Sequence, residues 1–389
     1  MPRILYLLNI SNPSQLSADS GWQFADLLAP ALIDQGTELV VAAPARVTDE
    51  RAHFQRMPVP ASKYRVRFDP GMDYLVGVIR RTNPDVVVAN QIEAAPAIRA
   101  ALLEAKSPAL LAGYCHYLPF SFAEGGQLRI DPAMDDRGLG LPVHLAFAAG
   151  LAALDRVLVH SATAASSVSA AASRAGADVT ERLRVVPAPR DERLVRDAGE
   201  LTAPAPGEPV TGMYNHRLYA HYGTARFVKL ADRLTSEAEV QVRLRVMDLF
   251  GQRSPERIAL DDSPERMRDQ LAATPGVDIL TDGGDRTAYR NLLVTSNFAL
   301  APFRPGCPWA MSVVDCQGMG LPVIAPRTGW FAEHIDDELL FSTSTQALAL
   351  VERLATDPVF YLEHAKRALA STADFHPALV AARYLEAVS

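Results

Sequence analysis

Arg3-Ile-Leu-Tyr-Leu-Leu8 is a continuous apolar run, which is typical of a strand buried on both faces of a sheet. Residues 9–21 are polar and rich in Ser, Asn and Pro, so we expect a loop there. Residues 22–35 then carry apolar side chains at helical spacing, and Gly36 ends that pattern before a second apolar run at 38–43. This order of strand, loop, helix and strand predicts a parallel sheet with helical crossovers.

The same alternation of strand and helix recurs along the rest of the chain. Strands are expected at 85–89, 109–112, 155–159 and 183–186, and then at 210–214, 242–247, 277–280, 298–301, 322–325 and 338–341. Between these two series, Leu201–Pro209 holds three prolines and a glycine in nine residues, which suits a linker. We therefore predict an α/β chain of two doubly wound, Rossmann-like domains, at 1–200 and 210–374. Ligands of such sheets bind outside the carboxyl ends of the strands, so we expect a cleft between the domains.

Composition limits the kinds of protein that this chain can be. It has 389 residues, of which 49% are hydrophobic and 21% charged, with a net charge of -7. The apolar fraction is too high for a disordered chain, and no run of about 18 uncharged apolar residues offers a membrane span. The short apolar burst at 1–8 lacks the features of a secretory signal, so we expect a cytoplasmic protein. Three cysteines (Cys115, Cys307 and Cys316) argue against a disulfide framework, and the acidic balance argues against a polybasic binder.

Residues 277–333 carry the clearest chemical pattern. A loop at 305–310 leads into a helix that bears Asp315 and ends at Gly320-Leu-Pro-Val323 before an apolar strand. A loop that enters a helix presents backbone N–H groups and a positive dipole end to a diphosphate. A carboxylate on that helix can accept hydrogen bonds from both ribose hydroxyls of a nucleotide.

This segment resembles the nucleotide-sugar site of glycosyltransferases with the two-domain B-type (GT-B) fold, especially the retaining family-four kind. The resemblance implies that Asp315 binds the donor. It also implies donor contacts from Gly283, Gly284, Cys307, Pro308, Trp309, Ala310 and Met311. The sequence departs from the family at Cys307, where an acid eight residues before Asp315 is usual. A neutral thiol cannot accept charge-strengthened hydrogen bonds from sugar hydroxyls, so either the sugar is held differently or catalytic power is lost.

A second segment, Met213–Gly223, follows a strand and precedes a helix. In the family this turn carries an arginine and, five residues later, a lysine, both facing the donor diphosphate. Arg217 stands at the arginine position and is our catalytic candidate, whereas Tyr222 replaces the lysine. Asn215 and His216 complete an Asn-His-Arg triplet that resembles the branch of tRNA-queuosine mannosyltransferases and phage DNA glycosyltransferases. We include Asn215, His216 and Tyr222 among the donor-binding candidates.

The first half contributes weaker signals. The resemblance places a histidine after the strand at 109–112, so His116 is a second catalytic candidate, and Gly21 is a small residue expected near the donor. Arg129 and Asp131, in the polar stretch 120–140, and Ser161, at a strand end, are acceptor-binding candidates. The tail at 375–389 resembles the family's closing helix, which commonly returns to the N-terminal domain.

We therefore expect a hexosyl- or pentosyl-transferase that moves sugar from a UDP- or GDP-sugar to an acceptor hydroxyl with retention. The N-terminal domain would bind the acceptor and the C-terminal domain the donor. The sequence leaves two classes of acceptor open, a modified nucleobase in DNA or RNA and a small molecule. No cofactor besides the donor is expected, and no metal, since no Asp-x-Asp motif follows a strand. Two alternatives share the fold: a nucleotide-sugar 2-epimerase, and a non-catalytic binding subunit, the latter suggested by Cys307 and Tyr222. The sequence does not predict the oligomeric state.

Overall fold

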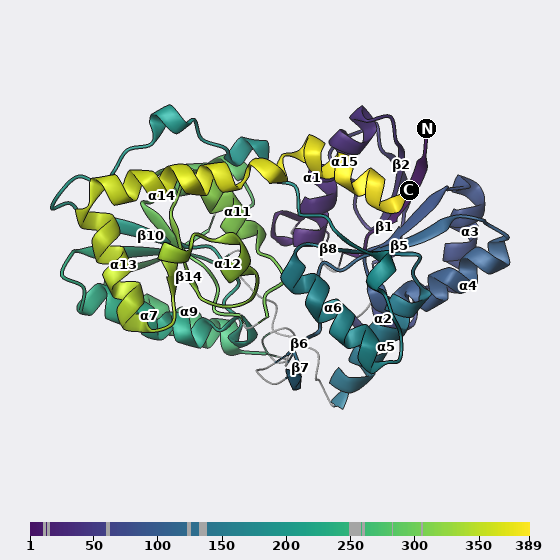
Figure 1. The fold of residues 1–389 in the computed structure, drawn as a ribbon, viewed down its shortest axis with the longest axis horizontal. Helices are drawn as coiled ribbons and strands as arrows, with labels where there is room; N and C mark the ends of the chain where they lie inside the picture. Colours follow the sequence, from purple (N-terminus) through teal and green to yellow (C-terminus); the bar gives the residue numbers. More distant parts are fainter. Residues whose placement is uncertain are drawn as a thin grey trace. The chain divides into compact units, whose positions relative to one another are not determined.

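A computed structural model describes residues 1–10, 13, 16–59, 63–122, 126–131, 138–248, 258, 261–281, 283–304 and 306–389. The chain forms two compact units (Figure 1). Unit 1 comprises Met1–Pro189 together with Phe375–Ser389, and unit 2 comprises Arg190–Asp374. Each unit is built around its own parallel sheet.

The sheet of unit 1 has seven strands in the order β3-β2-β1-β4-β5-β8-β9, all paired in parallel. The strands are β1 (Arg3–Leu7), β2 (Glu38–Ala43), β3 (His53–Arg56), β4 (Val86–Ala89), β5 (Leu110–Tyr114), β8 (Arg156–Val159) and β9 (Leu183–Val185). The central strand β1 sets the register, with Tyr6 opposite Val41 on one side and Val88 on the other. A small antiparallel hairpin of β6 (Phe120–Phe122) and β7 (Leu128–Ile130) lies outside this sheet.

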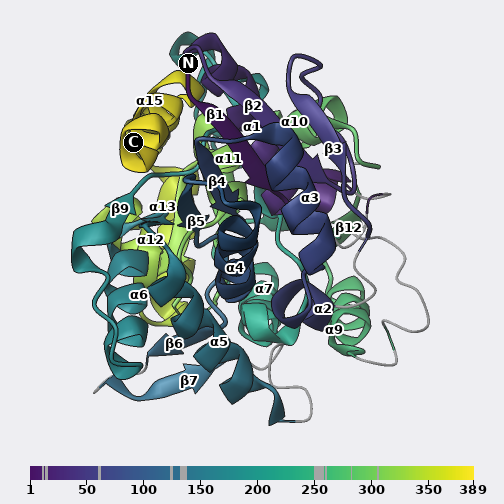
Figure 2. The same cartoon turned by 90° about the vertical axis from the view of Figure 1, so that its right-hand side faces the viewer.

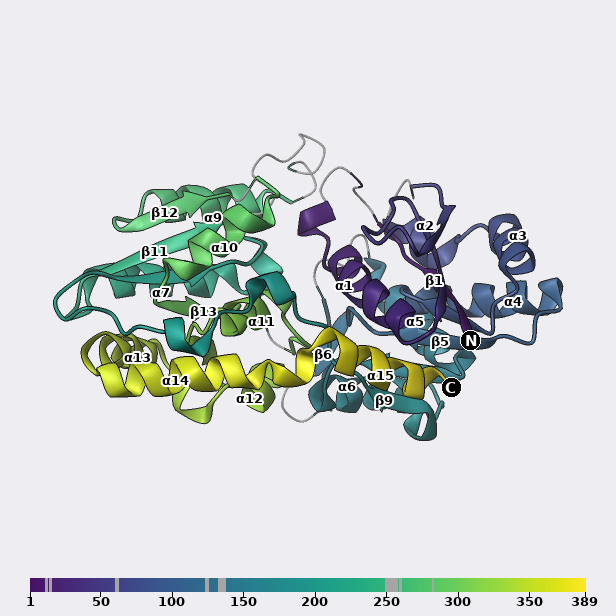
Figure 3. The same cartoon turned by 90° about the horizontal axis from the view of Figure 1, so that it is seen from above.

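Helices cover both faces of the unit 1 sheet. They are α1 (Ser20–Asp34), α2 (Lys63–Phe68), α3 (Met72–Thr82), α4 (Ala95–Ala105), α5 (Gly140–Ala153), α6 (Ala162–Arg174) and α15 (Pro377–Val388), with short turns η1 (Leu16–Ala18), η2 (Ile92–Ala94) and η6 (Thr180–Arg182). Figure 2 shows α3, α4, α5 and α6 following one another across one face. On the other face α15 lies beside α1 (Figure 3), and Gln35 Nε2 donates to the Ala378 carbonyl at 2.6 Å.

Strand β5 shows how alternating side chains serve the two layers. Leu111 belongs to the buried cluster that also takes in α3, α4, α5 and α6. Tyr114 points to the opposite layer, where its ring centroid lies 4.7 Å from that of Phe24 on α1 and 6.2 Å from that of Tyr384 on α15. Continuous apolar strands are what burial on both faces requires.

The sheet of unit 2 has six parallel strands in the order β12-β11-β10-β13-β14-β15. They are β10 (Val210–Tyr214), β11 (Val242–Met247), β12 (Val277–Leu280), β13 (Phe298–Leu300), β14 (Val323–Pro326) and β15 (Leu340–Phe341). The helices are α7 (Thr224–Ser236), α9 (Ser263–Ala272), α10 (Arg286–Val294), α11 (Met311–Gly318), α12 (Gly329–His334), α13 (Ser344–Thr356) and α14 (Pro358–Ser371). Short turns are η7 (Glu192–Leu194), η8 (Ala198–Glu200), η9 (Ala220–Tyr222), η10 (Asp337–Leu339) and η11 (Ala373–Phe375).

The prediction of two doubly wound α/β domains is confirmed, but the change from one unit to the next does not fall at the predicted linker. The structure changes unit between Pro189 and Arg190, not at 201–209. Residues 190–201 pack on unit 2, since the Arg196 amide donates to the Gly318 carbonyl at 2.9 Å and Leu201 lies against Gly320. The proline-rich stretch is therefore irregular chain within unit 2, and the first domain ends about a dozen residues before the predicted position.

Two further observations concern the chain as a whole. Cys115, Cys307 and Cys316 are all buried and free of disulfides. Among the helices of the described residues, none is both long enough and apolar enough to cross a membrane.

Candidate functional site

The candidate site of unit 2 is built at the carboxyl ends of the neighbouring strands β10 and β13. The loop after β10 runs from Asn215 to Gly223, and the loop after β13 leads to α11. Gly223 joins the two loops because its φ is +76° and a Cβ on it would lie 2.7 Å from the Phe303 carbonyl oxygen. Only glycine permits this combination of backbone angle and close approach. The edge formed in this way is where parallel sheets bind ligands.

A buried chain of hydrogen bonds crosses this edge. The Asn215 side chain, 2% exposed, donates from Nδ2 to the Tyr289 hydroxyl at 2.6 Å and to the Ser312 carbonyl at 3.1 Å. The Tyr289 hydroxyl in turn donates to Asp315 Oδ2 at 3.2 Å. Asp315, 6% exposed on α11, is thereby tied to the loop after β10 and to α10. Each polar group in this series of hydrogen bonds has a partner, so its burial is tolerated.

Arg286 provides the positive charge beside Asp315. Its Nη2 lies 3.7 Å from Asp315 Oδ2 and 2.9 Å from Asp191 Oδ2, and its guanidinium carbon lies 4.9 Å from the Tyr289 ring centroid. Arg193 also pairs with Asp191, at 2.8 Å. Asp191 and Asp315 are therefore buried acids that share one half-buried arginine.

These surroundings determine the charge of both acids. Burial raises the pKa of Asp315 to about 6, while the charge of Arg286 opposes a further rise. Burial would also raise the pKa of Asp191, but hydrogen bonds from Arg193 and the charge of Arg286 outweigh it, and the pKa is lowered. At neutral pH both side chains are mainly carboxylates. Asp315 can then accept hydrogen bonds from hydroxyl groups as well as from Tyr289.

His216 links the same two loops but carries no charge at neutral pH. Its Nδ1 lies 2.8 Å from the Ser312 hydroxyl at the start of α11, and the residue is 6% exposed. Burial lowers the pKa of His216 to about 3, so the ring remains neutral. It can position Ser312, but it cannot supply an imidazolium charge.

The segment before α11 is held by its own backbone. Cys307, 3% exposed, directs its thiol to the Trp309 carbonyl at 3.1 Å, and burial raises its pKa, so it remains a thiol. Its carbonyl accepts from the Trp330 amide at 3.3 Å. Pro308 is buried, whereas Trp309, Ala310 and Met311 are half-buried. Ala310 is the N-cap of α11 and has no side-chain oxygen to accept from the first-turn amides, which suits an anion at that end.

The remaining unit 2 candidates lie in the loops beside this edge. Arg217 is half-buried, three residues beyond β10. Tyr222 is half-buried in η9, and the Arg304 guanidinium carbon lies 5.3 Å from its ring centroid. Gly283 and Gly284 are exposed between β12 and α10, with φ of +62° and +83°. Their neighbour Asp282 lies outside the described residues.

In unit 1, His116 and Gly21 lie near one another at the carboxyl edge of the sheet. His116 Nε2 is 3.1 Å from the Tyr6 hydroxyl, and burial lowers the pKa of His116 to about 3. Its ring centroid lies 4.5 Å from that of Phe24, one turn along α1 from Gly21. A Cβ on Gly21 would lie 3.4 Å from Asn90 Nδ2, just past β4. His116 is therefore a neutral imidazole at neutral pH.

The acceptor-binding candidates do not share a single surrounding. Arg129 is exposed on β7, and Asp131 accepts a hydrogen bond from the Tyr117 hydroxyl. Ser161, 2% exposed, is the N-cap of α6, and its hydroxyl accepts from the Ala164 amide at 3.0 Å. The Ser161 side chain therefore caps the N-terminus of α6. The four charged residues 124, 135, 136 and 137 of the same polar stretch lie outside the described residues.

Solved structures resemble the whole chain. No family model and no curated protein matches its sequence. HepE of Anabaena, solved in complex with UDP-glucose, is similar with a TM-score of 0.70 and 14% identity over 99% of each chain. Sucrose-phosphate synthase of Thermosynechococcus elongatus has a TM-score of 0.74 and 14% identity, covering 99% of this chain and 98% of that one. A glycosyltransferase of Rickettsia africae has a TM-score of 0.67 and 14% identity, with coverage of 100% and 97%. The chain has the GT-B fold.

Units 1 and 2 are the two Rossmann-like halves of this GT-B fold. Sequence reasoning named Asp315, Asn215 and His216 as donor-site candidates, and the structure brings these three together, but the sequence did not point to Arg286, Asp191 or Arg304. Arg286 directly follows Asp285, the N-cap of α10, so the sequence there indicated only a helix start. Asp191 comes from the irregular chain before β10. Only tertiary packing brings Arg286 and Asp191 to Asp315, and Arg304 to Tyr222.

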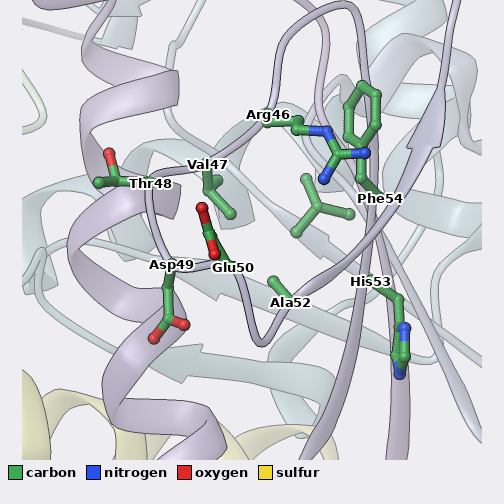
Figure 4. Close-up of a pocket in the computed structure, with 9 residues that line it drawn as sticks. Arg46, Val47, Thr48, Asp49, Glu50, Ala52, His53 and Phe54 are labelled. Carbon is green, nitrogen blue, oxygen red and sulfur yellow. The ribbon is translucent and has the colours of Figure 1, made fainter.

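Two other features of the structure have some of the properties of a binding site. A hollow of about 130 Å³ lies beside the loop between β2 and β3 in unit 1 (Figure 4). There the Arg46 guanidinium carbon lies 5.0 Å from the Phe54 ring centroid, and Asp49 is paired with Arg51. The hollow is smaller than the pockets of about 300–1,000 Å³ that take larger ligands. We assign it no function.

A cluster of three residues that could bind a metal ion lies in the described part of unit 2. Asp336, Glu338 and His364 have ligand atoms within 4.8 Å of one another. However, Arg367 Nη1 lies 2.8 Å from Asp336 Oδ2 and 3.4 Å from Glu338 Oε2. The guanidinium already supplies a positive charge to both carboxylates, so we assign no metal to this cluster.

Proposed function

We propose that the protein is a glycosyltransferase that moves a sugar from a UDP-sugar donor to an acceptor hydroxyl. The main support is the buried chain Asn215–Tyr289–Asp315 at the carboxyl edge of the unit 2 sheet, beside the start of α11. It combines an ionised acid, a helix N-terminus and, in the adjoining loop, Arg217. HepE, a protein of the same fold, was solved with UDP-glucose.

Each group has a chemical task in this proposal. Asp315 accepts hydrogen bonds from the ribose hydroxyls, and the first amides of α11 bind the diphosphate. Arg217 stabilises the negative charge that grows on the diphosphate as the bond to the sugar breaks. Gly283 and Gly284, in the loop between β12 and α10, border the nucleotide. His216 stays neutral and positions Ser312 at the start of α11.

The sugar is attached with retention in this proposal, and the acceptor proton passes to the departing diphosphate. Cys307 is not the base, because its thiol is buried, protonated and bonded to the Trp309 carbonyl. His116 is proposed to contact the donor sugar as a neutral imidazole. Arg129 and Asp131, on and beside β7, are proposed to meet the acceptor. A nucleic-acid acceptor requires binding that weakens steeply with salt, whereas a small acceptor does not, so a salt titration separates the two.

The first experiment is a thermal-shift screen against UDP, GDP and their sugars. A true donor binds only the folded protein and raises the melting temperature. The second measures turnover with the donor so found. Arg217→Ala should lower kcat at least about 100-fold with an unchanged melting temperature, because it removes stabilisation of the leaving group. Arg226→Ala, an exposed arginine on α7, is the matched control.

Two results would contradict the proposal. The first is a melting temperature that no nucleoside diphosphate or nucleotide sugar raises, which is what a non-catalytic subunit would give. The second is near-normal turnover of Arg217→Ala. Donor that is consumed without any acceptor would instead indicate an epimerase.

A further inference from the structure

Arg304 lies in the loop after β13 and has no role in the function proposed so far. It is 9% exposed, and its guanidinium carbon lies 5.3 Å from the ring centroid of Tyr222. A tyrosine side chain offers a phosphate a hydroxyl but no positive charge. The positive charge beside Tyr222 therefore comes from Arg304, in the loop after a different strand.

The backbone fixes this arrangement. A Cβ on Gly223 would lie 2.7 Å from both the Cβ and the carbonyl oxygen of Phe303, so the two chains touch immediately beside Tyr222 and Arg304. The Phe303 ring packs on Phe341 of β15, with centroids 5.6 Å apart. The close approach of Gly223 to Phe303 thus places Arg304 next to Tyr222.

The chemistry of Arg304 suits an anion. A guanidinium attracted to an aromatic ring keeps its positive charge and its planar fork of N–H groups. Those groups match two oxygens of a phosphate. Seven residues further along the same loop, α11 begins, and Arg217 lies in the loop that carries Tyr222. Two arginines and a helix N-terminus therefore occupy loops at neighbouring strand ends.

We propose that Arg304 binds the diphosphate of the donor and, with Arg217, stabilises it as a leaving group. This inference rests on the proposed function. In the reaction the bond between the anomeric carbon and the diphosphate oxygen breaks, and its electron pair stays on the diphosphate. The acceptor oxygen forms the new bond to the anomeric carbon and its proton passes to the diphosphate. Tyr222 is a positioning residue that holds the guanidinium of Arg304.

Calorimetric titration of the full chain with UDP and with uridine tests this role. Arg304→Met should weaken UDP binding about 10- to 100-fold, the cost of one charge-assisted phosphate contact, and leave uridine binding unchanged. Arg304→Lys should keep part of the UDP affinity, because it keeps the charge but not the planar fork. Tyr222→Phe should lose less UDP affinity than Tyr222→Ala, since it retains the ring beside the guanidinium. Arg226→Met, exposed on α7, is the control.

The outcomes separate this inference from the function on which it rests. Unchanged UDP affinity of Arg304→Met, or an equal loss for UDP and uridine, refutes the role of Arg304 while the transferase proposal stands. If the parent protein binds neither UDP nor UDP-glucose, the transferase proposal fails and the inference fails with it. Should Arg304→Met not fold, Tyr222→Ala is the second variant, because it removes the ring beneath the guanidinium. Tyr222→Ala should weaken the binding of UDP more than the binding of uridine, and equal effects on both would refute the role of Arg304.

Discussion

Replacing Arg286 by methionine tests the charge arrangement around Asp315 directly. The side chain of Arg286 is 16% exposed and it pairs with Asp191 at 2.9 Å and with Asp315 at 3.7 Å. Those two acids have side-chain exposures of only 2% and 6%. Methionine keeps an unbranched side chain against the Tyr289 ring but removes the charge. Asp315 then has no positive partner among these residues, while Asp191 keeps Arg193.

The size of the effect follows from these distances. With an effective dielectric constant of about 20, the two pairs correspond to attractions of about 6 and 4 kcal/mol. The net loss is smaller, because the arginine no longer has to be desolvated and the acids can take up protons. Removing one partner of a buried pair typically costs about 3–5 kcal/mol. For a unit the size of Arg190–Asp374, that lowers the melting temperature by about 6–20 °C.

The stability that Arg286→Met loses should depend on pH in a defined direction. Burial has already raised the pKa of Asp315 to about 6, and without Arg286 it rises further. An acid whose pKa is higher in the folded than in the unfolded protein destabilises the fold as pH rises through that range. The stability difference between the parent protein and Arg286→Met should therefore be largest above pH 7. It should narrow as the pH falls towards 5.

Scanning calorimetry of the full chain at pH 7.5 and pH 5 measures both effects on the transition of unit 2. Arg266→Met is the control, since its pair with Asp262 on α9 is exposed and should be worth less than about 1 kcal/mol. A loss of stability for Arg286→Met no larger than that for Arg266→Met would contradict the role of Arg286 in balancing the two buried acids. A loss of the same size at both pH values would show that the acids do not carry it.

Two further predictions concern unit 1, and urea unfolding measures both. A Cβ on Gly150 of α5 would lie 2.0 Å from the Ile92 carbonyl oxygen, so Gly150→Ala should lower the free energy of unfolding by about 1–3 kcal/mol or more. The control is Gly77→Ala in α3, whose Cβ would meet only a flexible arginine side chain and which should raise the free energy of unfolding by about 0.5–1 kcal/mol. Equal effects of the two substitutions would contradict close packing at Gly150. Arg67→Met removes the guanidinium that lies 3.0 Å from Glu93, whose side chain is 1% exposed, and should lower the free energy of unfolding by about 3–5 kcal/mol. Adding Glu93→Gln should recover part of that loss. No recovery would count against an ionic origin of the effect.

The fold was predictable because its signal is local and repeated. A parallel sheet buried on both faces needs uninterrupted apolar strands such as β1 and β4, and the sequence contains them at regular intervals. The boundary between the units was not predictable from composition. Prolines mark irregular chain, whereas the boundary depends on where Leu194 and Leu201 pack, and they pack on Gly318 and Gly320 of unit 2.

The candidate site divides in the same way. Asp315 could be named as a candidate from sequence because it precedes a helix end and an apolar strand at a fixed spacing. Arg286 and Arg304 were missed because their importance depends on contacts with residues from other segments, Asp191 and Tyr222. Ser161 had a local signal that favoured a different role, since a serine that precedes a helix is a frequent N-cap.

The assignment of Phe375–Ser389 to unit 1 has a consequence for how the protein is made. A ribosome that has finished the chain as far as Pro189 still has about 200 residues to add before α15 is available. At about 5–20 residues per second, that takes about 10–40 s. During this interval the surface of α1 that later receives α15 is uncovered, and Tyr114 lacks its neighbour Tyr384. Unit 2 can complete its own core before α15 is made, so unit 1 is the last to be finished although most of its residues precede those of unit 2.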